Sequence, residues 1–299
     1  MSRVLRSDDG RLRAGWRILV FFVLLIGMSV VLQLGVRALR GGLPRGSTLA
    51  LALVAFAATV AVIVARRYLD RKGFVSLGLA LDTTAVCDLL FGFGLSGLMA
   101  GAIFAIMAAA GLVENVAVQW GESARAAVDG SPEVVAMTAG TLLLLLLPTI
   151  LTGWWEEIVF RGYLFQNMVE GMGLAMSVLV SCLIYGVVHA ANPNAGLLSS
   201  SIIVGFGFLR LYGYLATKLL WLSIGMHIGW NFFQGPVFGY AASGQTQSAT
   251  LFTHTASGPD WLTGGDFGPE ASVITIPVLL ITLLVMRAWS RSSLRSRAS

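Results

Sequence analysis

The sequence predicts an all-α, polytopic membrane protein with about eight transmembrane helices, and three observations support this fold class. Only 12% of the 299 residues are charged, against about 25% in soluble domains. Hydrophobic residues make up 56% of the chain, and the mean hydropathy is +0.80. Apolar runs long enough to cross a hydrocarbon core of about 30 Å recur along the whole chain. No polar stretch between them is long enough to bury a soluble core.

We expect the apolar runs to form eight spans, at residues 18–36, 48–65, 89–112, 134–151, 174–191, 197–215, 219–233 and 271–289. The first run is too long for the apolar part of a signal peptide and should remain as a helix. Pro148 and Gly153 are expected to interrupt the fourth run, because proline removes a backbone hydrogen bond and kinks a helix. Residues 156–170 form a further helical stretch, closed by a turn at Gly171 and Gly173. A ninth span there would place the C-terminal arginines outside, so eight spans are preferred.

The net charge of +5 comes from arginines at both ends and beside helix ends. This distribution is typical of topology signals and of contacts with anionic headgroups, and it argues against a nucleic-acid partner. The positive-inside rule predicts a protein of the cytoplasmic (inner) membrane with both termini in the cytoplasm. Residues 114–133 and 235–270 then lie outside, in agreement with their scarcity of arginine. The loop with Arg37, Arg40 and Arg45 disagrees, because eight spans place it outside.

Two adjacent carboxylates, Glu156 and Glu157, follow one of the most apolar runs of the chain. A charged group inside hydrocarbon costs at least ~2.5–3.5 kcal/mol, so an ionisable residue there indicates a functional site. Glu157 and Arg161 are four residues apart, in the order that favours an ion pair on a helix. We therefore expect a structural pair between them. This pairing leaves Glu156 without a local partner and available for chemistry.

Two histidines and an asparagine in later apolar segments complete the candidate site. If the chain reverses near Met172, Glu156 lies sixteen residues before the turn and His189 seventeen after it. At a rise of ~1.5 Å per residue, an antiparallel hairpin would bring the two within about one or two ångströms in height. His227 and Asn231 are four apart and share one helical face. An imidazole and an amide on one face can bind a metal or donate hydrogen bonds to an oxyanion.

The sequence leaves two chemistries open for these residues. In the first, Glu156, His189 and His227 hold a zinc ion, and one coordination position remains for water. In the second, no metal is needed: Glu156 takes a proton from a water that His189 orients. His227 and Asn231 would then stabilise the tetrahedral oxyanion. Both chemistries hydrolyse an amide without a serine or cysteine nucleophile.

Three motifs occur in order on separate hydrophobic helices: Glu-Glu-x-x-x-Arg (Glu156, Glu157, Arg161), aromatic-x-x-x-His (Tyr185, His189) and His-x-x-x-Asn (His227, Asn231). In this order they resemble the CPBP family, the CAAX protease and bacteriocin-processing membrane proteins, which include the type II CAAX prenyl endopeptidases. The resemblance covers roughly residues 149–235. It implies an intramembrane endopeptidase. The catalytic residues that the resemblance implies are Glu156, Glu157, Arg161, His189, His227 and Asn231. The family's catalytic description is divided between a metalloprotease and a metal-free glutamate protease.

One residue departs from the family pattern. The family usually has phenylalanine where this chain has Tyr185, so the additional hydroxyl needs a hydrogen-bonding partner in the bundle. The retained aromatic ring should preserve the packing. All the polar members of the three motifs are present.

We therefore divide the chain into N-terminal transmembrane helices without a motif (1–134), a CPBP-like catalytic core (135–235), and a polar loop, last helix and basic tail (236–299). The expected partners are the lipid bilayer and a peptide or membrane-protein substrate, lipidated or not, which the sequence does not identify. The expected cofactor is one divalent metal, zinc, or none. Two alternatives are a catalytically silent scaffold and a proton-coupled transporter. The complete motifs argue against the first, and the absence of a visible internal repeat argues against the second.

Overall fold

The computed structural model describes residues 5–7, 9–41, 47–121, 123–128, 131–247 and 249–298, and helices dominate this part of the chain. The α-helices are α2 (Ala14–Arg40), α3 (Thr48–Val64), α4 (Thr83–Ala109), α5 (Ala139–Glu157), α6 (Phe165–Met172), α7 (Leu174–His189), α8 (Leu197–Thr217), α9 (Trp221–Phe232), α10 (Asp260–Thr263) and α11 (Thr275–Ala298). Three segments are π-helical: η1 (Ala65–Leu69), η3 (Ile158–Leu164) and η4 (Phe233–Val237). Short 3-10 turns are η2 (Phe74–Leu77), η5 (Gly265–Phe267) and η6 (Pro269–Ala271).

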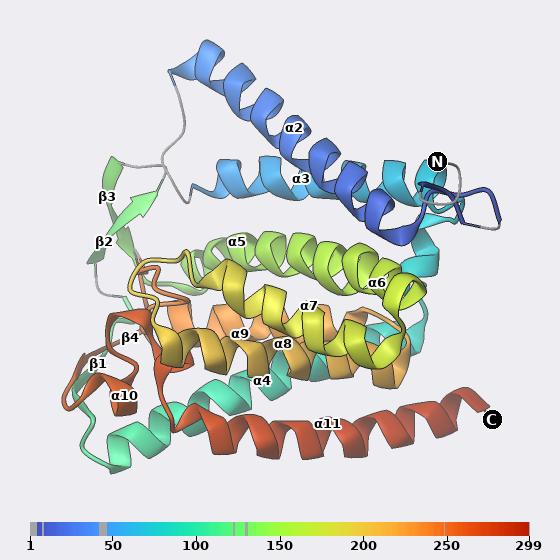
Figure 1. Cartoon of the computed structure of the whole chain (residues 1–299). Coiled ribbons are helices and arrows are strands. Elements are labelled where there is room, and N and C mark those ends of the chain that lie inside the picture. Colours follow the sequence, from blue (N-terminus) through green and yellow to red (C-terminus); the bar gives the residue numbers. More distant parts are fainter. Residues whose placement is uncertain are drawn as a thin grey trace.

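The predicted fold class is confirmed, since each of the eight expected spans overlaps one helix: α2, α3, α4, α5, α7, α8, α9 and α11. Among the described residues, five helical elements have the length and hydropathy to cross a membrane: Ala14–Leu39, Thr48–Leu69, Thr83–Ala109, Ala139–Met172 and Leu197–Thr217. The eight helices alternate in direction, so α2 begins and α11 ends at the same end of the bundle (Figure 1). We call this the terminal end, and the opposite end the strand end.

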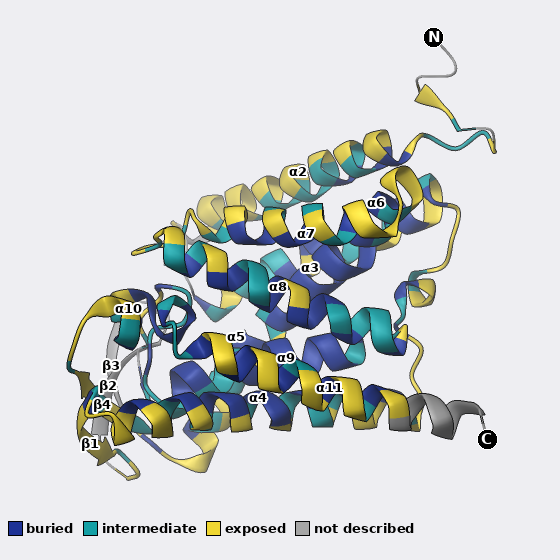
Figure 2. Cartoon of the chain, turned by 60° about the horizontal axis from the view of Figure 1, so that its bottom comes forward, coloured by how far each residue is buried: buried dark blue, intermediate teal, exposed yellow. Residues whose placement is uncertain are grey.

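Helix α9 lies at the centre of the bundle and packs on α4, α5 and α8. Its residues from Leu222 to Trp230 are all buried. The outer helix α2 packs on α3 and α6, and most of its surface is exposed (Figure 2). Apolar residues such as Val23 and Val31 are 63% and 68% exposed there. Exposed apolar side chains on an outer helix are consistent with contact to lipid.

Two glycines of α9 allow its backbone to touch that of α4. A Cβ atom at Gly225 would lie 2.1 Å from the Leu89 carbonyl oxygen, and one at Gly229 would lie 2.5 Å from that of Phe93. The pair forms a Gly-x-x-x-Gly motif, which is typical of close helix packing in membranes. Because His227 lies midway between the two glycines, this contact fixes the position of one motif histidine.

The predicted interruption of the fourth run at Pro148 and Gly153 is wrong, because α5 is continuous from Ala139 to Glu157. A helix in a membrane tolerates a proline where neighbouring helices pack on it. Gly153 has a packing role instead, since a Cβ atom there would lie 2.7 Å from Cγ1 of Ile228 on α9. The predicted helical stretch 156–170 is present as η3 and α6, and the chain turns at Gly173 with φ 78°.

Both regions assigned to the outer side contain β-strands that the sequence analysis did not predict. Strand β1 (Val113–Val118) pairs antiparallel with β4 (Phe252–Ala256), and β2 (Ser123–Val128) pairs with β3 (Ser131–Ala136). All four lie at the strand end (Figure 1). Within these regions Glu122 and Asp129 lie outside the described residues, as does Arg45 in the loop after α2.

A buried ion cluster at the terminal end ties the outer helix to the core. The carboxylate of Asp70 accepts hydrogen bonds from Arg17 at 2.7 Å and from Arg66 at 2.9 Å. Asn167 and Tyr163 donate to the same carboxylate at 3.2 and 3.5 Å. We call these five residues the Asp70 clamp. Arg17 and Arg66 are 3% and 2% exposed, so these two arginines of the terminal end pair inside the protein rather than facing headgroups.

Candidate active site

The three motifs meet inside the bundle on α5, α7 and α9. Glu156 and Glu157 close α5, Tyr185 and His189 lie in the last two turns of α7, and His227 is in the middle of α9. Glu157 is fully buried, while Glu156 is 8% and His227 2% exposed. His189 is half-buried. The fold therefore gathers polar groups from separate apolar helices, as the motif order predicts.

Glu157 is the centre of the hydrogen-bond network. Its Oε1 atom accepts from Arg161 Nη1 at 3.1 Å, which confirms the predicted pair, and also from His227 Nδ1 at 2.8 Å. An ionised carboxylate can only accept, so the His227 proton is on Nδ1 and Nε2 carries a lone pair. Arg161 Nη2 also donates to the carbonyl oxygen of Gly207 at 3.3 Å. Glu157 thus orients a histidine as well as neutralising an arginine.

Glu156 faces the other side of the same imidazole. Its Oε2 atom lies 3.8 Å from His227 Nε2, which is beyond hydrogen-bonding distance. The same oxygen accepts a hydrogen bond from the Tyr185 hydroxyl at 2.9 Å. The expected partner for this hydroxyl is therefore present. Glu156 and His227 bring together a carboxylate and an imidazole lone pair.

The structure places Glu156 beside Tyr185, one turn before His189. No hydrogen bond joins Glu156 to His189 in the described part of the chain. Part of the path from Glu156 to the hairpin turn is π-helical, in η3, and a π turn holds more residues than an α turn. His189 Nδ1 instead donates to the Tyr185 carbonyl oxygen at 2.8 Å. Since a carbonyl oxygen only accepts, the His189 proton is on Nδ1 and its Nε2 also carries a lone pair.

Arg210 on α8 is a site residue that the sequence analysis missed. It is 3% exposed, and its Nη1 atom donates to the Tyr185 hydroxyl oxygen. The guanidinium carbon of Arg161 lies 4.1 Å from the centre of the same tyrosine ring. Arg161 and Arg210 balance the two glutamates in charge. The available signal was a single arginine within the apolar run 197–215.

Only part of the suggested zinc site is assembled. Across the described ranges, no three histidine, cysteine, aspartate or glutamate side chains are close enough together to hold a metal ion. Glu156 and His227 lie together, whereas His189 does not complete the group. The donor chemistry nevertheless suits a metal, because a carboxylate on Nδ1 of a histidine is the usual outer partner of a metal-binding imidazole. Asn231 is half-buried one turn after His227, and we find no hydrogen bond to it within the described residues.

Comparison with known proteins supports the motif analysis. Residues 138–233 match the family model described as type II CAAX prenyl endopeptidase Rce1-like. A Bacillus subtilis (strain 168) protein named "Putative membrane peptidase YdiL" is 32% identical over 91 residues, which cover 30% of this chain and 35% of that protein. The chain thus matches about a third of this relative's length. The family match contains all three motifs and Arg210, and it confirms the resemblance to the CAAX protease (CPBP) family.

Proposed function

We propose that this chain is an intramembrane endopeptidase in which Glu156 activates the water that hydrolyses a peptide bond. The observation that carries the proposal is the position of Glu156 Oε2, 3.8 Å from an imidazole nitrogen whose ring is held by Glu157. The matched family and the matched relative are both named as peptidases. The substrate in this proposal is a peptide or a membrane-protein segment, lipidated or not. The enzyme acts in the cytoplasmic membrane with both termini in the cytoplasm.

The hydrogen bonds assign a separate role to each group. Glu156 and the Nε2 lone pair of His227 each accept one hydrogen of the attacking water, which aims its oxygen at the substrate carbonyl. Glu156 takes the proton as the water oxygen bonds to the carbonyl carbon and an electron pair moves onto the carbonyl oxygen. The amide of Asn231 donates to this oxyanion. Glu156 then returns the proton to the leaving nitrogen, the C–N bond breaks, and an acid and an amine are formed.

Tyr185 and Arg210 act as positioning residues. The Tyr185 hydroxyl donates to Glu156 and accepts from Arg210, so the carboxylate is held in one orientation. Arg161 acts through Glu157, which fixes the ring of His227. These contacts preorganise the site before substrate binds.

A divalent metal also fits the tautomers of the site. Both histidines have the proton on Nδ1 and therefore offer Nε2 as a ligand atom. Glu156 and His227 would hold the ion, and His189, which does not complete the group in this structure, would have to approach them to become the third ligand. A bound zinc ion would supply Lewis-acid polarisation of the carbonyl and a more acidic water.

The decisive experiment is the change Glu156→Gln in protein reconstituted into vesicles with a candidate peptide library. Loss of the general base should reduce cleavage by at least about 100-fold. The melting temperature should be retained, because Glu156 is outside the pair with Arg161. Glu114→Gln, at an exposed glutamate of β1, is the matched control and should cleave within about twofold of wild type. Activity of the Glu156 variant within about tenfold of wild type would exclude it as the base.

A second experiment decides the role of metal. We expect purified protein to contain near-stoichiometric divalent metal and His227→Ala to lose it, because His227 has the only ring held on Nδ1 by a carboxylate in the described chain. Elemental analysis with and without strong chelators is the measurement. Active protein that holds no metal and resists chelators would assign the reaction to Glu156 acting on water alone, with the same essential residues.

A further inference from the structure

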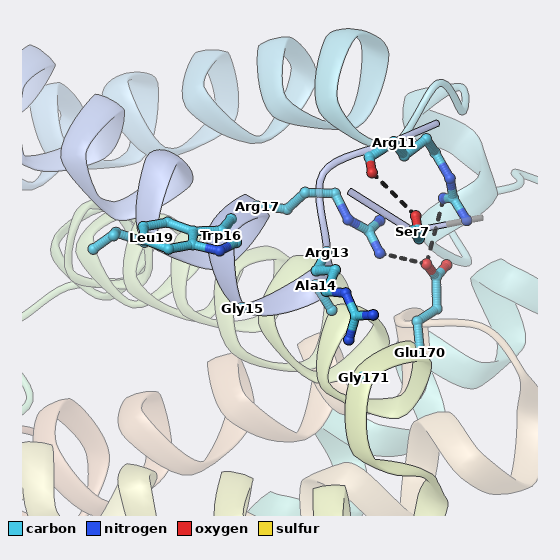
Figure 3. Close-up of a pocket in the computed structure, with 10 residues that line it drawn as sticks. All are labelled: Ser7, Arg11, Arg13, Ala14, Gly15, Trp16, Arg17, Leu19, Glu170 and Gly171. Carbon is cyan, nitrogen blue, oxygen red and sulfur yellow. Dashed lines mark hydrogen bonds and ion pairs between the residues drawn. The ribbon is translucent and has the colours of Figure 1, made fainter. Parts of the chain in front are cut away.

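A cavity of about 820 Å³ opens at the terminal end (Figure 3). It lies where the segment before α2, with Ser7, Arg11 and Arg13, meets the start of α2 and the end of α6. Three guanidinium groups, from Arg11, Arg13 and Arg17, line it together with a single carboxylate, that of Glu170. The first turn of α2 has no acidic residue and no side-chain cap. Its free backbone N–H groups add positive potential to the same place. The cavity is therefore suited to an anion.

The three arginines differ in how far they are already neutralised. Both terminal nitrogens of Arg17 are engaged, by Asp70 at 2.7 Å and by Glu170 at 2.6 Å, and its buried Nε has no partner among the described residues. Arg17 thus forms the fixed wall of the cavity and belongs to the Asp70 clamp.

Arg11 and Arg13 differ in their capacity for a ligand. Arg11 lies 2.6 Å from Asp9 through Nε and 3.4 Å from Glu170 through Nη1, which also donates to the Asp70 carbonyl oxygen at 3.3 Å. Among the described residues this leaves Nη2 of Arg11 for a ligand. Arg13 is exposed, and the structure shows one hydrogen bond from it within the described residues, from Nε to the Arg6 carbonyl oxygen at 3.4 Å. Both terminal nitrogens of Arg13 therefore remain for an oxyanion, which suits the forked geometry of phosphate binding.

An apolar ridge begins at the rim of this cavity and continues along α2. Trp16 and Leu19 line the cavity and are 40% and 52% exposed, and Val23, Ile26 and Val30 follow at 63%, 60% and 49%. Their spacing of three and four residues places all five on one face of the helix. A tryptophan at the junction between polar and apolar surface is typical of the membrane interface.

We propose that this cavity binds the phosphate headgroup of an anionic phospholipid, with the acyl chains lying along the apolar ridge of α2. Arg11 and Arg13 contact the phosphate oxygens, and Arg17 holds the cavity open by its pairs with Asp70 and Glu170. Free phosphate shares the headgroup chemistry but makes no use of the ridge. The continuity of the cationic cavity with the exposed apolar face therefore favours a lipid.

The test uses the full-length chain in detergent, titrated with short-chain phosphatidylglycerol, short-chain phosphatidylcholine or inorganic phosphate, with binding followed by native mass spectrometry. The double variant Arg11→Gln/Arg13→Gln should bind phosphatidylglycerol about 25-fold more weakly, at about fivefold per arginine near the membrane surface. The control Arg67→Gln/Arg71→Gln removes two exposed arginines from the same end. It should bind within about twofold of wild type.

The single variant Arg13→Gln keeps the test valid if the double variant unfolds, because Arg13 is in no ion pair of the described chain. It should lose about fivefold in affinity for phosphatidylglycerol. Equal losses in the Arg67/Arg71 control would show a general surface charge effect and overturn the proposal. Inorganic phosphate binding as tightly as phosphatidylglycerol would show a soluble-anion site and overturn it as well.

Discussion

The Asp70 clamp and the candidate active site are both buried ion clusters, and they differ in how completely their carboxylates are satisfied. Asp70 accepts hydrogen bonds on both oxygens, two on Oδ1 from Arg17 and Tyr163 and two on Oδ2 from Arg66 and Asn167. Glu157 receives both of its donors on Oε1, and its buried Oε2 has no partner among the described residues. Glu156 Oε2 accepts from Tyr185 and lies 3.8 Å from His227 Nε2, too far for a hydrogen bond between them.

This difference separates a structural cluster from a reactive one. A buried carboxylate that accepts on both oxygens stabilises one arrangement, whereas a buried acceptor without a partner costs free energy. The contrast concerns the carboxylates alone, because Arg17 Nε and Asn167 Oδ1 of the clamp are also buried without a partner among the described residues. Glu157 bears this cost next to the proposed reacting carboxylate of Glu156, and buried groups with unusual surroundings are common at catalytic sites. The clamp should therefore control stability and leave the chemistry unchanged. The site should control chemistry at a smaller cost in stability.

The largest expected effect is on stability, from Asp70→Ala. Removing this carboxylate leaves Arg17 and Arg66 buried without a counter-charge, and breaking a buried pair costs about 3–5 kcal/mol. Thermal unfolding in detergent should show this loss, while the turnover number of the folded fraction stays at the wild-type value. Asp266→Ala, at an exposed aspartate, is the control and should change stability by less than about 0.5 kcal/mol. A fall in turnover number without a fall in melting temperature would contradict the structural role of the Asp70 clamp.

Arg161→Ala should affect both properties. Glu157 keeps His227 as a donor, so the loss of unfolding free energy should fall near 3 kcal/mol, at the low end of the range for a broken buried pair. Cleavage should also fall by at least about tenfold, because the carboxylate that orients His227 is no longer fixed. Arg161→Lys should recover part of the stability through its charge. An unchanged melting temperature with full activity would show that Arg161 supports neither the stability nor the chemistry of the site.

Tyr185→Phe should have the smallest effect on cleavage among the site variants and sharpen the comparison within the site. The variant removes both hydrogen bonds of the hydroxyl, to Glu156 and from Arg210, each worth about 1.5–3 kcal/mol because its partner is charged, and it keeps the ring that packs on Arg161. We expect cleavage to fall by no more than about tenfold, because the general base remains and because the CPBP family, which this chain resembles, usually has phenylalanine at this position. Steady-state cleavage rates against wild type provide the measurement. Complete inactivation would instead make the hydroxyl a reacting group.

The sequence predicted the features that depend on local spacing. Apolar run lengths located the helices, the four-residue spacing located the pair of Glu157 and Arg161, and Gly173 located the turn. The contacts that it did not predict join residues far apart in the chain. Nothing local distinguishes Arg17 from the neighbouring arginines of a basic flank, because the partner, Asp70, is in a different segment.

The same reason explains two further misses. Arg210 was visible as a lone charge in an apolar helix, but its partner Tyr185 lies on the preceding helix, and no periodic pattern connects them. Strands β1 and β4 pair Val113 with Ala256, and such long-range pairing leaves no signal in either segment alone. The expected height match of Glu156 with His189 assumed an α-helical rise throughout, whereas part of the path is π-helical in η3, so the match stays a prediction.

The π-helical segment η3 makes the effect of a deletion depend on where in the chain it falls. A π turn holds one residue more than an α turn, so removing one residue between Ile158 and Leu164 would let the segment relax into an ordinary α-helix. The side chains after the deletion, including Asn167, would then keep nearly their present facing. Helix α8 is α-helical from Leu197 to Thr217 and has no extra residue to release, so a deletion before Arg210 would rotate this side chain by about 100° away from Tyr185.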